Sequence, residues 1–287
     1  MRNWFGLLVV AAWLAAAPAE AGWSFRQSVR ISGQGDARDT SNTSTVQIEE
    51  GDARIDFEEV AGNPMFAKGG YILLRGSEPK GMFIVNPEAK TYAKFDPAGL
   101  TQAMAPMAQA MEGTGFAMTV ADAKLVKLVD EPGEQMQGLA TRHLRTRKSY
   151  VMTMEMANMK MPTAHDVIDD VWLTQEISLG SADFGEAMGS LSGAPALAGL
   201  QQLAELEKEI LTGFPLKRVT VDHSVPQGKG MMARMMGGKE ETVTITMEVQ
   251  DLKKVRIPPA TFAIPAGYTE AQMMQPGTPA PDLEDED

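Results

Sequence analysis

The methionines are the residues of this chain whose type and spacing most readily suggest chemistry. Met152, Met154 and Met156 alternate along one expected strand and share a face of it with Tyr150. Thioether sulfurs are soft ligands that select Cu(I), whereas the unbranched methionine side chain also fills irregular space and suits a cavity for flexible apolar chains. Ordinary core packing explains the same pattern, so the residues alone leave three interpretations open.

Metal binding is the least favoured of the three. Met159 and Met161 have the opposite parity, so a bulge or turn near Asn158 is needed to align all five methionines. The histidines are scattered, and none lies beside a methionine pair: His143, His165 and His223. We therefore predict no metal site and no cofactor, and keep Cu(I) binding as the second alternative.

Catalytic motifs are absent from the sequence. The glycines of Gly189 to Gly193 flank a leucine where a nucleophile elbow has serine, and neither a zinc-protease helix motif nor a phosphate-binding glycine loop is found. His165-Asp166 is typical of a turn or surface pair, and Asp169-Asp170 of the start of a strand. We expect that the protein is not an enzyme.

A methionine-rich loop is expected between Pro226 and Lys239. Apolar side chains exposed at a loop tip usually mark a contact site, and Arg234 would suit an anionic membrane headgroup. Folding of the loop back over the sheet is the alternative. The candidate docking residues are Met231, Met232, Arg234, Met235 and Met236.

Most of the chain predicts β-strands, because apolar and polar residues alternate with a period of two. In the segment Arg54 to Glu58, for example, Ile55 and Phe57 should face a core. The Asn86-Pro87 pair predicts a turn between two such strands. The expected strands are 23–31, 45–48, 54–58, 71–74, 82–85, 91–95, 118–129, 139–156, 167–179, 216–225 and 241–255.

Two amphipathic helices are expected, over 96–111 and 195–211, the second of them ending at Gly213. The apolar stripe of the first consists of Leu100, Met104, Met107 and Met111. Apolar helix stripes must be buried against a sheet. The predicted fold class is therefore α+β, mainly β: a curved antiparallel sheet that forms an incomplete (half) β-barrel, with helices covering its concave face.

Composition limits the compartment and the partners. Arg2, the apolar run 4–17 and Ala19-Glu20-Ala21 predict a cleaved signal peptide over residues 1–21 and a periplasmic protein. The absence of cysteine excludes disulfides and a lipidated cysteine. A net charge of -12 argues against nucleic acid as a partner. We expect one monomeric domain over 22–270 and a disordered acidic tail over 271–287.

Five blocks of the chain together resemble the bacterial domain of unknown function 4412. They are QIEEGDARIDF (47–57), MFIVNPEAKTY (82–92), VWLT (171–174), GFPLK (213–217) and IPPATFAIPAGY (257–268). That family is similar to the periplasmic lipoprotein carriers LolA and LolB, whose half-barrel with a helical lid holds acyl chains. The methionine-rich blocks 152–161 and 231–236 depart from the family pattern. The resemblance implies the half-barrel fold and an apolar ligand cavity, but it carries over no catalytic residues.

These observations together predict a periplasmic protein that binds a lipid or another hydrophobic molecule, as a carrier or chaperone. The first alternative is a non-catalytic envelope scaffold that binds a protein or the membrane surface. The expected ligand-binding residues are Leu100, Met104, Met107, Met111, Tyr150, Met152, Met154, Met156 and Trp172.

Overall fold

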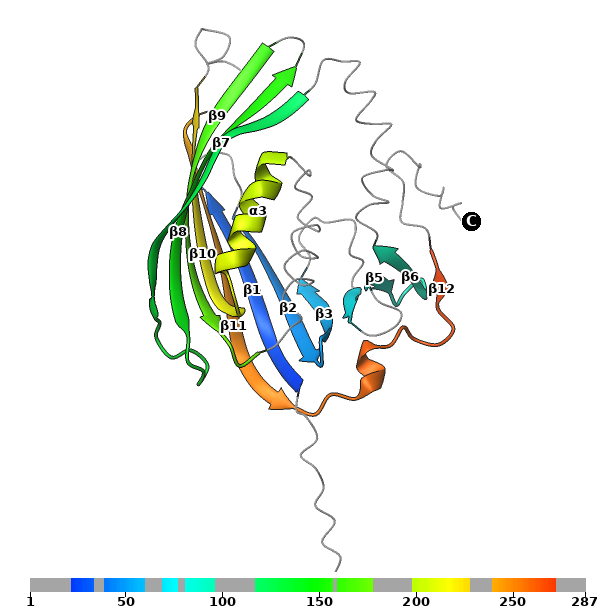
Figure 1. Ribbon diagram of the computed structural model, residues 1–287. Helices are drawn as coiled ribbons and strands as arrows, with labels where there is room; N and C mark the ends of the chain where they lie inside the picture. Colours follow the sequence, from blue (N-terminus) through cyan, green and yellow to red (C-terminus); the bar gives the residue numbers. More distant parts are fainter. Residues whose placement is uncertain are drawn as a thin grey trace, which may run out of the picture.

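The computed structural model describes residues 22–33, 39–59, 69–76, 81–95, 117–156, 159–177, 198–227 and 239–271. Twelve strands within these ranges form a single open sheet (Figure 1). The strands are β1 (Gly22–Gly33), β2 (Thr40–Glu49), β3 (Asp52–Glu59), β4 (Tyr71–Arg75), β5 (Gly81–Asn86), β6 (Thr91–Phe95), β7 (Ala117–Pro132), β8 (Arg142–Met156), β9 (Met159–Thr174), β10 (Phe214–Pro226), β11 (Glu241–Val255) and β12 (Thr269–Glu270).

The sheet consists of two antiparallel meanders joined at its centre. Its strand order is β12-β6-β5-β4-β3-β2-β1-β11-β10-β9-β8-β7. The first meander runs from β1 to β6 and the second from β7 to β11. Because β11 returns to pair with β1, Gly22 lies opposite Val255, and this pairing makes the two meanders one sheet. Only β12 runs parallel to its neighbour, β6, among the described strands.

Two β-bulges contribute to the curvature of the sheet. Asp122 in β7 and Asp251 in β11 have positive φ angles of 56° and 54°, and the strand register shifts beside each of them. An extra residue in one strand increases the local twist and bends the strand. Aspartate is one of the few non-glycine residues that adopt this backbone conformation readily.

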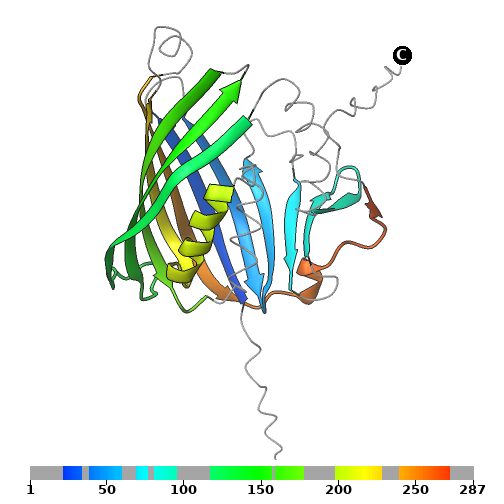
Figure 2. The ribbon, with the colours of Figure 1, turned by 45° about the horizontal axis from the view of Figure 1, so that its top comes forward.

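The sheet curls toward one side, which we call the inner face, and the main core lies there (Figure 2). Alternation along the strands places Phe25, Val46 and Ile55 on this face, all at 2% exposure or less. Phe25 meets Phe214 edge-on, with ring centroids 5.4 Å apart. The other buried members of this core are Ile48, Ala53, Ile72, Leu74, Met82, Leu139, Ile177, Leu216 and Val249.

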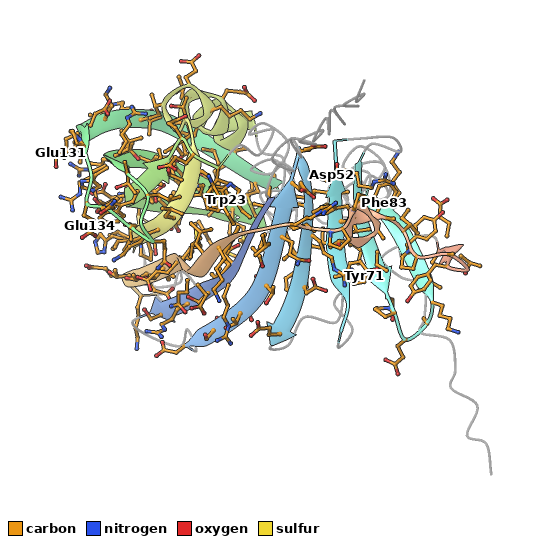
Figure 3. The ribbon with its side chains drawn as sticks, turned by 90° about the horizontal axis from the view of Figure 1, so that it is seen from below. Trp23, Asp52, Tyr71, Phe83, Glu131 and Glu134 are labelled. Carbon is orange, nitrogen blue, oxygen red and sulfur yellow. The ribbon has the colours of Figure 1, made fainter. Side chains whose placement is uncertain are left out.

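A second core lies on the opposite, outer face at the β3 to β6 end of the sheet. Tyr71, Leu73, Phe83 and Val85 point outward there because they alternate with the inner-face residues of β4 and β5. The segment after β11, which contains the 3-10 helix η1 (Pro259–Phe262), covers them (Figure 3). Both faces of these strands are therefore buried.

The expectation of helices covering the concave face is wrong. The described chain is nearly all sheet, and its one α-helix is α3 (Ala198–Ile210), which lies against β7. A helix of 13 residues is about 20 Å long. Twelve strands, in contrast, extend over roughly 50 Å. The fold is therefore an open, mainly β sheet with one short helix at one end.

The strands agree with the sequence pattern in their order, but some bounds differ. β2 starts at Thr40 and not at the expected 45, and β9 runs from Met159 to Thr174 and not over the expected 167–179. The short strand β12 was not expected. The expected signal peptide, the helix over 96–111 and the acidic tail from residue 272 lie outside the described residues. Among the helices that the structure describes, none combines the length and the apolar character needed to cross a membrane.

Candidate functional site

The inner face near the β8–β9 hairpin carries several of the expected ligand-binding methionines. Strand register places Met154 opposite both Met118 of β7 and Met161 of β9. One step down the strands, Met152 lies opposite Val120. We call these five residues the methionine patch. Directly paired residues share a face of a sheet, so the five side chains form one apolar surface.

The reversal of the chain between β8 and β9 explains why odd-numbered methionines of β9 face the same side of the sheet as even-numbered methionines of β8. Met156 pairs with Met159, so the odd-numbered methionine at 161 faces the same side as the even-numbered one at 154. The patch is only partly buried, and Met154 remains 36% exposed. Met156 is the last residue of β8, and its side chain does not belong to the described part of the structure.

A polar group of three residues adjoins the methionine patch on the same face. Tyr150 stacks on the imidazole of His165, with ring centroids 4.8 Å apart and planes inclined by 8°. The Nδ1 atom of His165 lies 3.1 Å from a carboxylate oxygen of Asp222 on β10. Burial, and secondarily the charge of Asp222, raise the pKa of Tyr150 to about 12, so its phenol is neutral at physiological pH.

Further along the inner face, a buried ion network fastens α3 to the sheet. Asp169 is 1% exposed and accepts hydrogen bonds from Arg218 Nε at 2.9 Å and from the Thr220 hydroxyl at 2.7 Å. Lys148 donates to Glu207 of α3 at 2.8 Å. Burial alone would raise the pKa of Asp169, but the guanidinium of Arg218 and the ammonium of Lys148 hold that pKa below its ordinary value.

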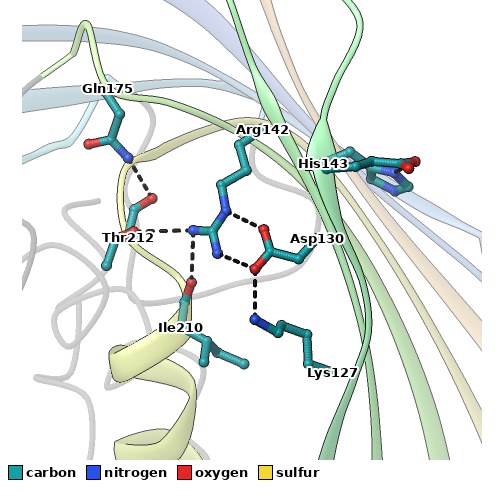
Figure 4. Close-up of polar contacts among 8 residues, drawn as sticks. Lys127, Asp130, Arg142, His143, Gln175, Ile210 and Thr212 are labelled. Carbon is teal, nitrogen blue, oxygen red and sulfur yellow. Dashed lines mark hydrogen bonds and ion pairs between the residues drawn. The ribbon is translucent and has the colours of Figure 1, made fainter.

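The end of α3 is fixed by a second set of polar contacts (Figure 4). The guanidinium of Arg142 donates to the backbone carbonyl of Ile210 and to the hydroxyl of Thr212, both at 3.3 Å. It also donates to Asp130 of β7 at 2.7 Å, which, together with Lys127, lowers the pKa of that carboxyl. A cation at a helix C-terminus stabilises the unpaired carbonyls and the helix dipole.

Trp172 lies on the outer face, so the structure does not bring it together with Tyr150, Met152 and Met154. It stacks on His143, with ring centroids 4.6 Å apart and planes inclined by 15°. His143 in turn contacts Asp170 at 2.7 Å. These contacts belong to a charged outer surface of β8 to β10.

Several candidate residues lie outside the described part of the chain. They are the helix stripe Leu100, Met104, Met107 and Met111 and the docking residues Met231, Met232, Arg234, Met235 and Met236. Within the described ranges, no group of three or more histidine, cysteine, aspartate or glutamate side chains is arranged to hold a metal ion.

The sequence reasoning missed the polar residues of the inner face. His165 and Asp169 were interpreted by their neighbours in sequence, as a turn or surface pair and as the start of a strand. The usable signal was position along β9: both residues lie on the same face of the strand as Val167 and Val171, which are buried. Position in such an alternation predicts an inward-facing side chain even when the residue is polar.

No protein-family model matches the chain, and no curated protein matches its sequence. A domain assigned to outer membrane lipoprotein sorting, from Vibrio parahaemolyticus, aligns with 85% of this chain and 90% of its own, at 8% identity and a TM-score of 0.29. A DUF1329 family protein from Desulfovibrio piger aligns with 86% of this chain and 91% of its own, at 8% identity and a TM-score of 0.28. TM-scores this low carry no argument about fold or function, and the resemblance to domain of unknown function 4412 stays a prediction.

Proposed function

We propose that the inner face of the sheet binds the apolar part of a lipid or another hydrophobic molecule, and that the protein is a non-catalytic carrier or chaperone of the bacterial envelope. The envelope location rests on the export-signal pattern of residues 1–21. The carrier role is supported by the resemblance of the five sequence blocks and by the character of the inner face.

The observation that carries the proposal is the contrast between the two faces of single strands. Along β11, the inner positions hold Val243, Ile245 and Met247, and none of these side chains is fully buried. Ile245 is 37% exposed, and Met154 of the methionine patch is 36% exposed. The outer positions that alternate with them hold threonine: Thr242, Thr244 and Thr246. An apolar face that the described residues leave partly uncovered is suited to an apolar ligand.

The energetics of such binding are favourable for a chain of modest length. Each methylene group that leaves water contributes about 0.8 kcal/mol. Methionine side chains adjust their shape at small cost, which suits ligands that differ in chain length. The outer face of β8 and β9 instead carries ion pairs, in which Arg145 contacts Asp170 and Arg147 contacts Asp166.

The test is binding of an environment-sensitive acyl probe to the exported protein and to pairs of variants on opposite faces. Met154→Glu and Ile245→Glu should each weaken probe binding at least tenfold, because a ligand would bury the new carboxylate without a partner. Thr153→Glu and Thr246→Glu place the same charge on the outer face and should leave binding unchanged. Equal effects on both faces, in variants with native circular dichroism, would refute the proposal.

The row Met118, Met154 and Met161 favours a second candidate function, binding of Cu(I). Paired residues on neighbouring strands lie close enough for three thioether sulfurs to approach one soft ion. Cu(I) should be titrated against a competing chelator, with Met154→Leu as the variant. Leucine preserves the apolar surface but removes the sulfur. Loss of a one-to-one copper complex with retained probe binding would establish this candidate, and absence of a complex in the parent protein would remove it.

A further inference from the structure

The distal nitrogen of His165 is a buried polar atom that the binding of an apolar chain does not use. The His165 side chain is 10% exposed, and its Nε2 atom is fully buried and has no hydrogen-bond partner among the residues that the structure describes. Buried polar side-chain atoms in native proteins are nearly always paired, because an unpaired one loses its hydrogen bonds to water without replacement. This atom therefore points to a ligand group.

We propose that His165 Nε2 accepts a hydrogen bond from a neutral donor, a hydroxyl or an amide N–H, at the polar end of the hydrophobic ligand. The inference rests on the proposed function and specifies its ligand class. It makes His165 a binding residue of the inner face, next to the methionine patch that takes the apolar part.

The partner of the other ring nitrogen determines the role of Nε2. The carboxylate of Asp222 can only accept hydrogen bonds, so Nδ1 carries the hydrogen that joins the two groups at 3.1 Å. In the neutral imidazole, the lone pair is then on Nε2, which is the acceptor. Nε2 is also the ring nitrogen further from the backbone.

The position of the ring matches an amphiphile that lies along the strands. His165 is paired with Tyr150, and the next inward positions, Thr163 and Met152, are paired with each other. Beyond them comes the row that contains Met154. A ligand with its apolar chain on the methionine patch would thus bring its polar end to the imidazole. Stacking against Tyr150 holds the ring in place.

The charges around His165 select a neutral donor over an anion. The Asp222 carboxylate directly adjoins the ring, so a carboxylate or phosphate headgroup would meet a like charge. The cations further along this face, Lys148 and Arg218, are already paired with Glu207 and Asp169. A hydroxyl or an amide N–H carries no negative charge, so it is not repelled by Asp222 and needs no cation as a partner.

The experiment compares 1-dodecanol with dodecyl methyl ether as competitors of the acyl probe. The two share an apolar chain, but only the alcohol donates a hydrogen bond. The parent protein should bind the alcohol about three- to tenfold more tightly, which is the contribution of one hydrogen bond. His165→Asn preserves a donor toward Asp222 but removes the distal acceptor, so it should abolish the preference. His165→Gln restores an acceptor near the Nε2 position and should retain part of it.

The outcomes separate this inference from the proposed function. If neither compound competes with the probe, the proposed function fails. If both compete equally in the parent protein, or if His165→Asn keeps the preference, the hydrogen bond to His165 is refuted while binding of apolar chains stands. Thermal unfolding of both variants checks that the fold is intact.

Discussion

Lys148 of β8 and Glu207 of α3 form the contact that ties the helix to the inner face. Their side chains are 14% and 19% exposed, and the ammonium lies 2.8 Å from the carboxylate. The same ammonium lies 3.8 Å from Asp169, and Arg218 lies 3.6 Å from Glu207. Two cations and two carboxylates thus balance each other beneath the helix, so each charge depends on the other three.

Replacement of Glu207 by glutamine should therefore weaken the whole unit. We expect the free energy of unfolding in urea to fall by about 2 kcal/mol, the usual contribution of a hydrogen bond to a charged group. Glu205→Gln on the same helix is the matched control. Glu205 is 72% exposed and pairs only with Lys208 among the contacts described for it, so its loss should cost no more than about 0.5 kcal/mol. Equal losses would show that α3 is not held by this network.

Acid should destabilise the protein through Asp169. Its pKa is lowered in the folded state, so the stability that it contributes is complete above the ordinary aspartate pKa of about 4 and is lost as the pH falls through the lower folded value. Unfolding measured from pH 7 to pH 2 should show this decline. Asp169→Asn should reduce the slope and lower stability at pH 7 by about 3 kcal/mol, because it leaves Arg218 without its main partner.

The control for that experiment is Asp166→Asn on the outer face. The pKa of Asp166 is also lowered by an arginine, Arg147, but both side chains are well exposed. Solvent screening should limit its effect to less than about 1 kcal/mol. A larger change for Asp166 than for Asp169 would contradict the assignment of the acid sensitivity to the buried network.

Most of the strands were predictable, because most of them carry a two-residue period of their own, but the predicted helical cover of the concave face was wrong. The run from Thr242 to Val249 alternates so clearly that its faces could be read directly, whereas the bulge at Asp251 places Leu252 on the inner face as well. The pairing of β11 with β1 was not predictable, since no local signal joins segments at the two ends of a domain. Nor could the extent of helix be predicted: an apolar stripe indicates amphipathicity but not how much of a wide sheet one helix covers.

The part of the candidate site that lies on a single strand was predictable, whereas the part that depends on strand pairing was not. Tyr150, Met152 and Met154 were identified because they lie at alternate positions of one strand. Asp222 and His165 are 57 residues apart, and only the sheet register brings them together. Trp172 was included for its residue type, but parity alone places it on the face opposite Met152.

The bulge at Asp251 offers a test of how the sheet acquires its curvature. Its φ angle of 54° is unfavourable for a β-branched residue, so Asp251→Val should lower the free energy of unfolding by about 1–2 kcal/mol. Asp251→Asn, which tolerates the same backbone conformation, should be close to neutral. Urea denaturation distinguishes the two. An equal loss in both variants would mean that the carboxylate rather than the backbone conformation matters.

The segment between β10 and β11 should be replaceable without loss of the fold. Ser224 already pairs with Glu241, so the ladder is complete before the segment begins. A short Gly-Ser turn in place of residues 229–238 changes the closure entropy by less than about 1 kcal/mol. Thermal stability should hold, whereas association with vesicles of anionic lipid should fall. A large loss of stability would instead show that its methionines pack against the sheet.

The position of β1 and β11 at the middle of the sheet has a consequence for how the chain matures. The strand that joins the two meanders, β11, is the last long strand to be synthesised. Gly22 of β1 therefore cannot pair until Val255 has been made. Contacts between such distant segments form slowly, because the intervening chain must first be brought together. Until then the polypeptide is two separate meanders with open edges.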